Sequence, residues 1–218
     1  MKPVELIKLI EQGEGLRIEF KQRFTEYEKI AKEMIAFANT KGGYVIVGVD
    51  DDKTVRGVLS EKSEAELLRE SAENYCEPPI EYSFHFVELF DREIVVCKIR
   101  ESLRKPHRLQ DYQKDLDLNT AQVFIRVADK SVPASKEMIK ILQARSANTP
   151  LVNYEVGKNE KAVFNFLKDN EIITVKELSD WANISYRRAS RTLIKLVRAE
   201  MLNIHVKDNG ENYFSSAV

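Results

Sequence analysis

The sequence predicts an α+β protein with two domains, a mixed sheet with helices followed by three helices and a β-hairpin. Over residues 1–142, strands with alternating or continuous apolar residues interchange with segments of helical periodicity. This periodicity fades over 143–158, where we expect a linker, and a helical pattern that ends in a hairpin occupies 159–218. A chain of 218 residues is long enough for two domains of ordinary size.

The composition is that of a globular protein with a hydrophobic core. Hydrophobic residues make up 43% of the chain, and 34 Lys and Arg balance 35 Asp and Glu. The balance excludes a protein that is basic throughout, although it permits a local basic face. The longest strongly apolar run, 44–49, is too short to span a bilayer, and the N-terminal residues lack the pattern of a signal peptide. Two cysteines give no disulfide framework, so we expect a cytoplasmic protein without membrane contact.

The first domain is predicted element by element from hydrophobic spacing. In chain order, the expected elements are a helix at 3–12, a strand at 16–21, helices at 27–38 and 64–75, strands at 44–49, 81–89, 93–100 and 122–127, and a helix at 135–142. In the first strand, Leu16, Ile18 and Phe20 should face the core. Residues 103–120 are polar and mixed in charge, and we expect a long loop there.

The second domain has the layout of a winged helix-turn-helix. Thr174 and Glu177 are spaced as a capping box that opens the second helix, and Ser185 should cap the third. An Asn-Gly dipeptide at 209–210, between two alternating segments, predicts the hairpin that forms the wing.

The third helix of this domain concentrates positive charge. Residues 185–198 contain five bases and no acid. In a helix-turn-helix, the N-terminal residues of the recognition helix meet base edges and phosphates. The sequence therefore predicts binding to double-stranded DNA, with Arg187, Arg188 and Arg191 reading the site. The expected supporting residues, which contact phosphate or extend the surface, are Ser185, Tyr186, Lys195, Arg198 and Lys207.

Two segments of the first domain carry a family resemblance. One is EGLRIEFK at 14–21; the other is AFANTKGGYVIVGVDDD at 36–52, with a Gly-Val pair at 57–58. Together they resemble the AlbA-type domain of the Schlafen family over residues 5–142. In bacteria such domains are often followed by a helix-turn-helix. The resemblance thus implies a bacterial DNA-binding protein that acts as a transcriptional regulator.

The same resemblance implies a second possibility. In some animal Schlafen proteins, two glutamates and an aspartate of these motifs form a metal-dependent site that cleaves RNA. The matching residues here are Glu14, Glu19 and an aspartate of the run 50–52, with Asp50 favoured. Carboxylates bind Mg²⁺ or Mn²⁺, and such a metal activates water for hydrolysis.

Three functions therefore stay open, with DNA binding preferred. Under that reading the protein is not an enzyme and needs no cofactor. Under the nuclease reading it uses Mg²⁺ or Mn²⁺ and acts on RNA. A protein-interaction module without nucleic-acid contact is the third. We also expect a homodimer formed through the N-terminal sheet, because a two-fold pair doubles the surface available to read a palindromic site.

Overall fold

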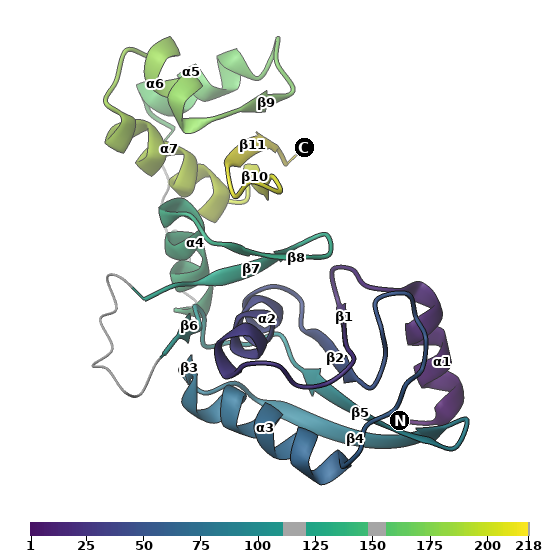
Figure 1. Ribbon diagram of the computed structural model, residues 1–218. Helices are drawn as coiled ribbons and strands as arrows, with labels where there is room; N and C mark the ends of the chain where they lie inside the picture. Colours follow the sequence, from purple (N-terminus) through teal and green to yellow (C-terminus); the bar gives the residue numbers. More distant parts are fainter. Residues whose placement is uncertain (111–120, 148–155, 218) are drawn as a thin grey trace. The chain divides into compact units, whose positions relative to one another are not determined.

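The computed structural model describes residues 1–110, 121–147 and 156–217 (Figure 1). The described residues form two compact units, Met1–Pro133 and Ala134–Val218, and each unit has a hydrophobic core of its own. Within the described ranges, no helix combines the length and the apolar character that a membrane crossing would require. The α+β class expected from the sequence is confirmed.

The first unit is built on a four-stranded sheet with the order β1-β2-β5-β4. Its elements are α1 (Pro3–Gln12), β1 (Ile18–Lys21), α2 (Tyr27–Asn39), β2 (Gly43–Val47), α3 (Glu61–Asn74), β3 (Cys76–Glu77), β4 (Tyr82–Leu89), β5 (Arg92–Ile99), β6 (Arg108–Leu109), β7 (Phe124–Val127) and β8 (Lys130–Pro133). Strands β3 and β6 pair with each other, as do β7 and β8.

Strands β1 and β2 are parallel, and α2 is the crossover that connects them. Both strands therefore end at the same edge of the sheet, where Lys21 lies opposite Val47. Gly43 opens β2 at a close approach, because a Cβ atom there would lie 2.5 Å from the Phe37 ring. This explains why the helix-ending Lys-Gly-Gly segment has glycine at this position.

The sheet has a separate core on each face. Alternate residues of β2 and β5 face α2 and α3, and include Val45, Val95 and Cys97. Their neighbours Ile46, Ile94 and Val96 face α1, whose Leu6 is fully buried. This burial on both faces explains why β2 is an almost unbroken apolar run.

Two expectations for the first unit need correction. The first strand begins at Ile18, and Leu16 is 43% exposed instead of facing the core. The predicted loop at 103–120 is partly buried: it contains β6, and its Lys105 and His107 are buried. Asn39 accounts for this, because its side chain donates to the His107 carbonyl and accepts from the His107 amide. Residues 111–120 of this segment lie outside the described residues.

The second unit contains the predicted three helices and hairpin, together with one further helix. Its elements are α4 (Lys136–Ser146), α5 (Lys158–Phe166), β9 (Ile172–Ile173), α6 (Val175–Trp181), α7 (Tyr186–Arg198), β10 (Leu202–Val206) and β11 (Asn212–Ser216). The hairpin β10–β11 extends to a three-stranded sheet, because β9 pairs with β11.

Helix α4 moves the boundary between the domains. The sequence predicts the end of the first domain at residue 142, after this helix. The packing instead places α4 in the second unit, since Ile141 is buried in that unit's core. Glu137 on α4 also accepts a hydrogen bond of 2.6 Å from Ser190 on α7. The periodicity revealed the helix but not the core that it joins. Of the predicted linker at 143–158, α4 occupies the beginning, and residues 148–155 lie outside the described residues.

Candidate functional site

Helix α7 starts at the predicted cap. Ser185 has an extended backbone, and its hydroxyl accepts from the Arg188 amide at 3.4 Å. The turn before it passes through Asn183, whose positive φ of 49° is one that asparagine tolerates better than most residues. The connection between α6 and α7 is therefore short and fixed at both ends, as a helix-turn-helix requires.

The bases of α7 share one face of the helix. At about 100° per residue, Arg187, Arg188, Arg191, Lys195 and Arg198 fall within an arc of about 100°. The first four are exposed and Arg198 is half-buried. Away from them lie the fully buried side chains Ala189, Leu193 and Leu196. We refer to these five bases as the α7 basic stripe.

Two predicted supporting residues lie apart from the stripe. Tyr186 projects from the opposite side of α7, where burial and the charge of Glu137 on α4 raise the pKa of its hydroxyl. Lys207, in the hairpin turn, lies 3.9 Å from the carboxylate of Glu211. The turn also contains Asp208, so the predicted wing carries more acid than base.

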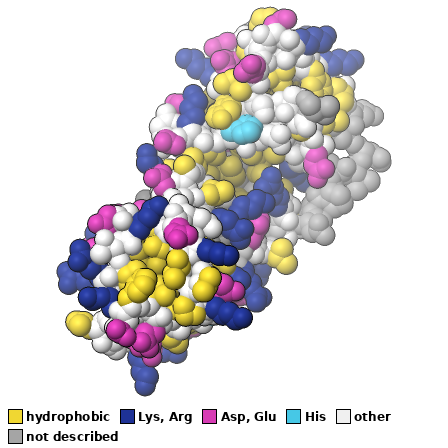
Figure 2. Space-filling view, turned by 90° about the vertical axis from the view of Figure 1, so that its right-hand side faces the viewer, with side chains coloured by type: hydrophobic (Ala, Val, Ile, Leu, Met, Phe, Trp, Pro, Cys, Tyr) yellow, Lys and Arg dark blue, Asp and Glu magenta, His cyan; other side chains and the backbone are white. Residues whose placement is uncertain are grey.

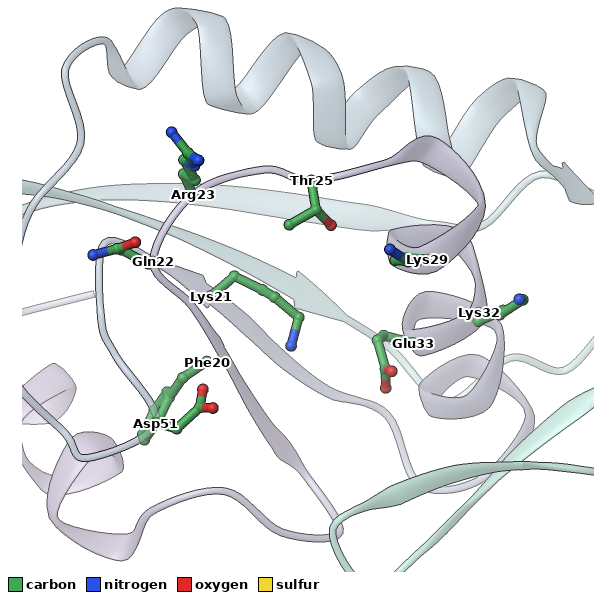
Figure 3. Close-up of a pocket in the computed structure, with 9 residues that line it drawn as sticks. All are labelled: Phe20, Lys21, Gln22, Arg23, Thr25, Lys29, Lys32, Glu33 and Asp51. Carbon is green, nitrogen blue, oxygen red and sulfur yellow. The ribbon is translucent and has the colours of Figure 1, made fainter.

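The first unit has a pocket of about 440 Å³ beyond the ends of β1 and β2 (Figure 3). Such a position, outside the carboxyl ends of parallel strands, commonly holds ligands in α/β sheets. The pocket is lined by four bases and two acids among other residues, namely Phe20, Lys21, Gln22, Arg23, Thr25, Lys29, Lys32, Glu33 and Asp51. In Figure 3 the side chains of Lys21, Glu33 and Asp51 point into the same space.

The three predicted catalytic carboxylates have different surroundings. The Glu19 carboxylate is buried and forms ion pairs with Lys21 and, at 2.9 Å, with Arg126. Glu14 accepts a hydrogen bond of 2.9 Å from the Phe20 amide. Asp50 forms an ion pair of 2.8 Å with Arg56.

The structure therefore does not bring Glu14, Glu19 and Asp50 together as metal ligands. In the described part of the chain, no group of three His, Cys, Asp or Glu residues is arranged to hold a metal ion. The aspartate that lines the pocket is Asp51, not the favoured Asp50. The pKa of Glu14 is raised, chiefly by burial and further by the charges of Glu19 and Asp51.

Arg126 on β7 is the residue that sequence reasoning missed. Its guanidinium is fully buried and contacts the carboxylates of Glu19 and Glu33, the latter at 2.6 Å. It also donates to the Gly15 carbonyl and lies over the Phe37 ring. Burial, followed by the charge of Glu19, raises the pKa of Glu33. The available signal was an arginine within an otherwise apolar strand, where an unpaired charge would be costly.

Comparison with known proteins identifies the first unit. The family described as Schlafen, AlbA_2 matches residues 14–135. A solution structure of the N-terminal domain of a RecG-related protein from Nitrosomonas europaea is similar, with 21% identity and a TM-score of 0.40 over 48% of this chain and 79% of that one. A crystal structure of a Corynebacterium diphtheriae protein has 14% identity and a TM-score of 0.43 over 66% of this chain. The present chain spans only 32% of that protein.

The family match contains both motif segments that carry the resemblance, from Glu14 to the aspartates after β2, and it extends through Arg126. It covers more than half of the chain. The chain therefore belongs to the Schlafen, AlbA_2 family.

Proposed function

We propose that the protein binds double-stranded DNA through the α7 basic stripe and acts as a transcriptional regulator. The observation that carries the proposal is the stripe itself: five bases on one helix face with no acid in the helix. Such a surface matches the charge of the phosphate backbone, and a helix fits the major groove.

The surrounding elements support a winged helix-turn-helix assignment for α5 to β11. A short turn joins α6 to α7, and the hairpin β10–β11 follows α7 directly. The α7 core face is fixed by Ala189, Leu193 and Leu196, so the stripe is held facing away from the core. The wing contributes little in this proposal, because Lys207 is offset by two neighbouring acids.

Binding of a labelled duplex to the full chain, measured by fluorescence anisotropy over a salt series, tests the proposal. We expect affinity to fall steeply with salt, because phosphate contacts release counterions. Replacing Arg187, Arg188 and Arg191 together by Ala should flatten the slope of log K against log salt by up to about three. The control is Lys176→Ala, an exposed base of α6 outside the stripe. Absence of binding to any duplex at low salt would instead favour a protein-interaction module.

Sequence reading should depend on the start of α7 more than on its end. Arg188 lies in the first turn, and Lys195 lies seven residues later, about 10 Å along the helix. In a selection from random duplexes, Arg188→Ala should relax the preference at one base position, at a cost of about 1–3 kcal/mol. Lys195→Ala should weaken all sequences alike. The reverse pattern would show that the opposite end of α7 enters the groove.

A metal-dependent ribonuclease is the second candidate function. It is favoured by the pocket in which Lys21, Glu33 and Asp51 converge next to Glu14 and Glu19. Carboxylates of this kind would hold Mg²⁺ or Mn²⁺, which supplies activated water. Cleavage of RNA with Mn²⁺ that is lost in both Glu19→Ala and Asp51→Asn, but kept in Asp50→Asn, would establish it. RNA that stays intact with Mn²⁺ would rule it out.

A further inference from the structure

The two edges of the four-stranded sheet are treated differently. The β1 edge is closed by its own chain: the Gly15 amide donates to the Ile18 carbonyl at 3.0 Å, and the Glu14 carboxylate accepts from the Phe20 amide. Arg126 also donates to the Ile18 carbonyl at 3.4 Å. Strand β4 forms the other edge, and within the described residues it pairs with β5 alone.

The β4 edge lacks the features that keep edge strands from pairing. It is eight residues long and contains no Lys, Arg, Asp or Pro, and its single carboxylate is Glu88. Native proteins usually protect an exposed edge with lysine, proline, a bulge or a very short strand. Tyr82, Phe84 and Phe86 instead form an aromatic row with ring centroids 5.0 and 6.2 Å apart. Phe86 is 49% exposed, and Phe90 in the following turn is 75% exposed.

The side of the first unit that carries α1 and the β4–β5 turn is also apolar at its surface. Figure 2 faces this side, and in its lower body hydrophobic side chains gather within a border of charged ones. Contiguous apolar surface bordered by polar groups is typical of an interaction site.

We propose that β4 pairs antiparallel with β4 of a second copy of this chain, so that the two sheets join across a two-fold axis. The partner is a second copy because the strand is complementary to itself in this arrangement. If the axis passes at His85, Phe84 of each copy lies opposite the partner's Phe86, which gives two aromatic cross-strand pairs. Each Glu88 then lies opposite the partner's Tyr82.

The charges also favour an antiparallel copy. In this register the two Glu88 carboxylates are six residues apart along the edge, which is about 20 Å. A parallel, in-register pair would instead place them side by side, where like charges are destabilising. At the axis, burial lowers the pKa of His85, so the facing imidazoles are neutral at pH 7.

This interface is independent of the α7 stripe, although a two-fold pair would also present two such helices to DNA. The test is analytical ultracentrifugation of the full chain from low to high micromolar concentration. We expect a mass twice the 25.2 kDa of one chain. Phe86→Lys should raise the dimer dissociation constant about tenfold or more, since it places a charge in the aromatic row. Leu59→Lys, at a fully exposed position outside β4, is the matched control and should leave the constant unchanged.

Hydrogen exchange of the wild-type protein gives a second readout, should Phe86→Lys fail to fold. The β4 amides that point away from β5 should exchange more slowly as concentration rises, whereas β1 amides should not change. A wild-type protein that stays monomeric at high micromolar concentration overturns the proposal, as does a dimer equally stable in both lysine variants. DNA binding measured on the same samples reports on the α7 stripe separately, so either proposal can fail alone.

Discussion

Arg126 combines complete burial with two carboxylate partners and a backbone carbonyl. Replacing it by Met should destabilise the first unit by about 3–5 kcal/mol, because Glu19 and Glu33 would remain as buried, unpaired carboxylates. Chemical denaturation at neutral pH measures this loss. Arg17→Met, at an exposed position of the same unit, is the control and should have little effect. Similar stability for the two variants would mean that the buried network adds nothing to the fold.

Glu33 gives a prediction with a defined pH dependence. Burial and the charge of Glu19 raise its pKa in the folded protein above the ordinary value of 4.5. Ionisation of Glu33 therefore costs stability as pH rises from about the ordinary pKa through the raised one. Glu33→Gln avoids this cost, so its free energy of unfolding relative to wild type should increase over that range. A relative stability that falls with rising pH would show that the ion pair with Arg126 outweighs burial.

At this scale the sequence predicted residue types better than partners. Ser185 as a cap and Cys97 as a core residue are confirmed, because each depends on neighbours close in the chain or on burial alone. The partners of Glu19 and Asp50 could not be predicted. Arg126 reaches Glu19 across 107 positions of the chain, and nothing in the spacing of the motif separates Asp50 from Asp51.

At the scale of elements, α6 provides a test of local stabilisation. The Thr174 hydroxyl accepts from the Glu177 amide at 3.2 Å, while the Glu177 carboxylate accepts from the Thr174 amide at 2.7 Å. Thr174→Ala should lower the free energy of unfolding of the second unit by about 1 kcal/mol, because it leaves an N-terminal amide of the helix unpaired. Lys176→Ala in the same helix should change it by less than about 0.5 kcal/mol. An equal loss in both variants would mean that the capping box does not stabilise α6.

The elements that the sequence predicted are those with long, regular hydrophobic spacing. Helices α2, α3 and α7 and strands β2, β4 and β5 are confirmed to within a few residues. The sequence analysis did not predict β3, β6 or β8, because each has at most four residues and pairs through backbone groups that leave no periodic signal. The buried part of the predicted loop depends on Asn39, whose bonds to His107 span 68 positions.

At the scale of the whole chain, charge is distributed unevenly between the two units. Residues 134–218 contain thirteen Lys and Arg against ten Asp and Glu, so the first unit carries the net negative charge of the chain. The near-zero total therefore conceals a basic second unit. Long-range attraction to a polyanion should act mainly on that unit, where the α7 basic stripe lies.

The boundary between the units gives the last prediction. A fragment of residues 134–218 should unfold cooperatively, whereas one of residues 159–218, which lacks α4, should be less stable. The shorter fragment loses the burial of Ile141, which contributes about 1.5–3 kcal/mol, and the bond between Glu137 and Ser190. Thermal melting of both fragments measures the difference.

Ile141→Ala in the full chain is the matched substitution for this test. It should destabilise the second unit by about 2–5 kcal/mol, because it leaves a cavity next to α7. The first unit has a separate core, so its own unfolding transition should not move. Equal melting temperatures for the two fragments would place α4 outside the second core and restore the boundary at residue 142. A loss confined to the shorter fragment and to Ile141→Ala would instead show that α4 is the first helix of the unit that presents the basic stripe.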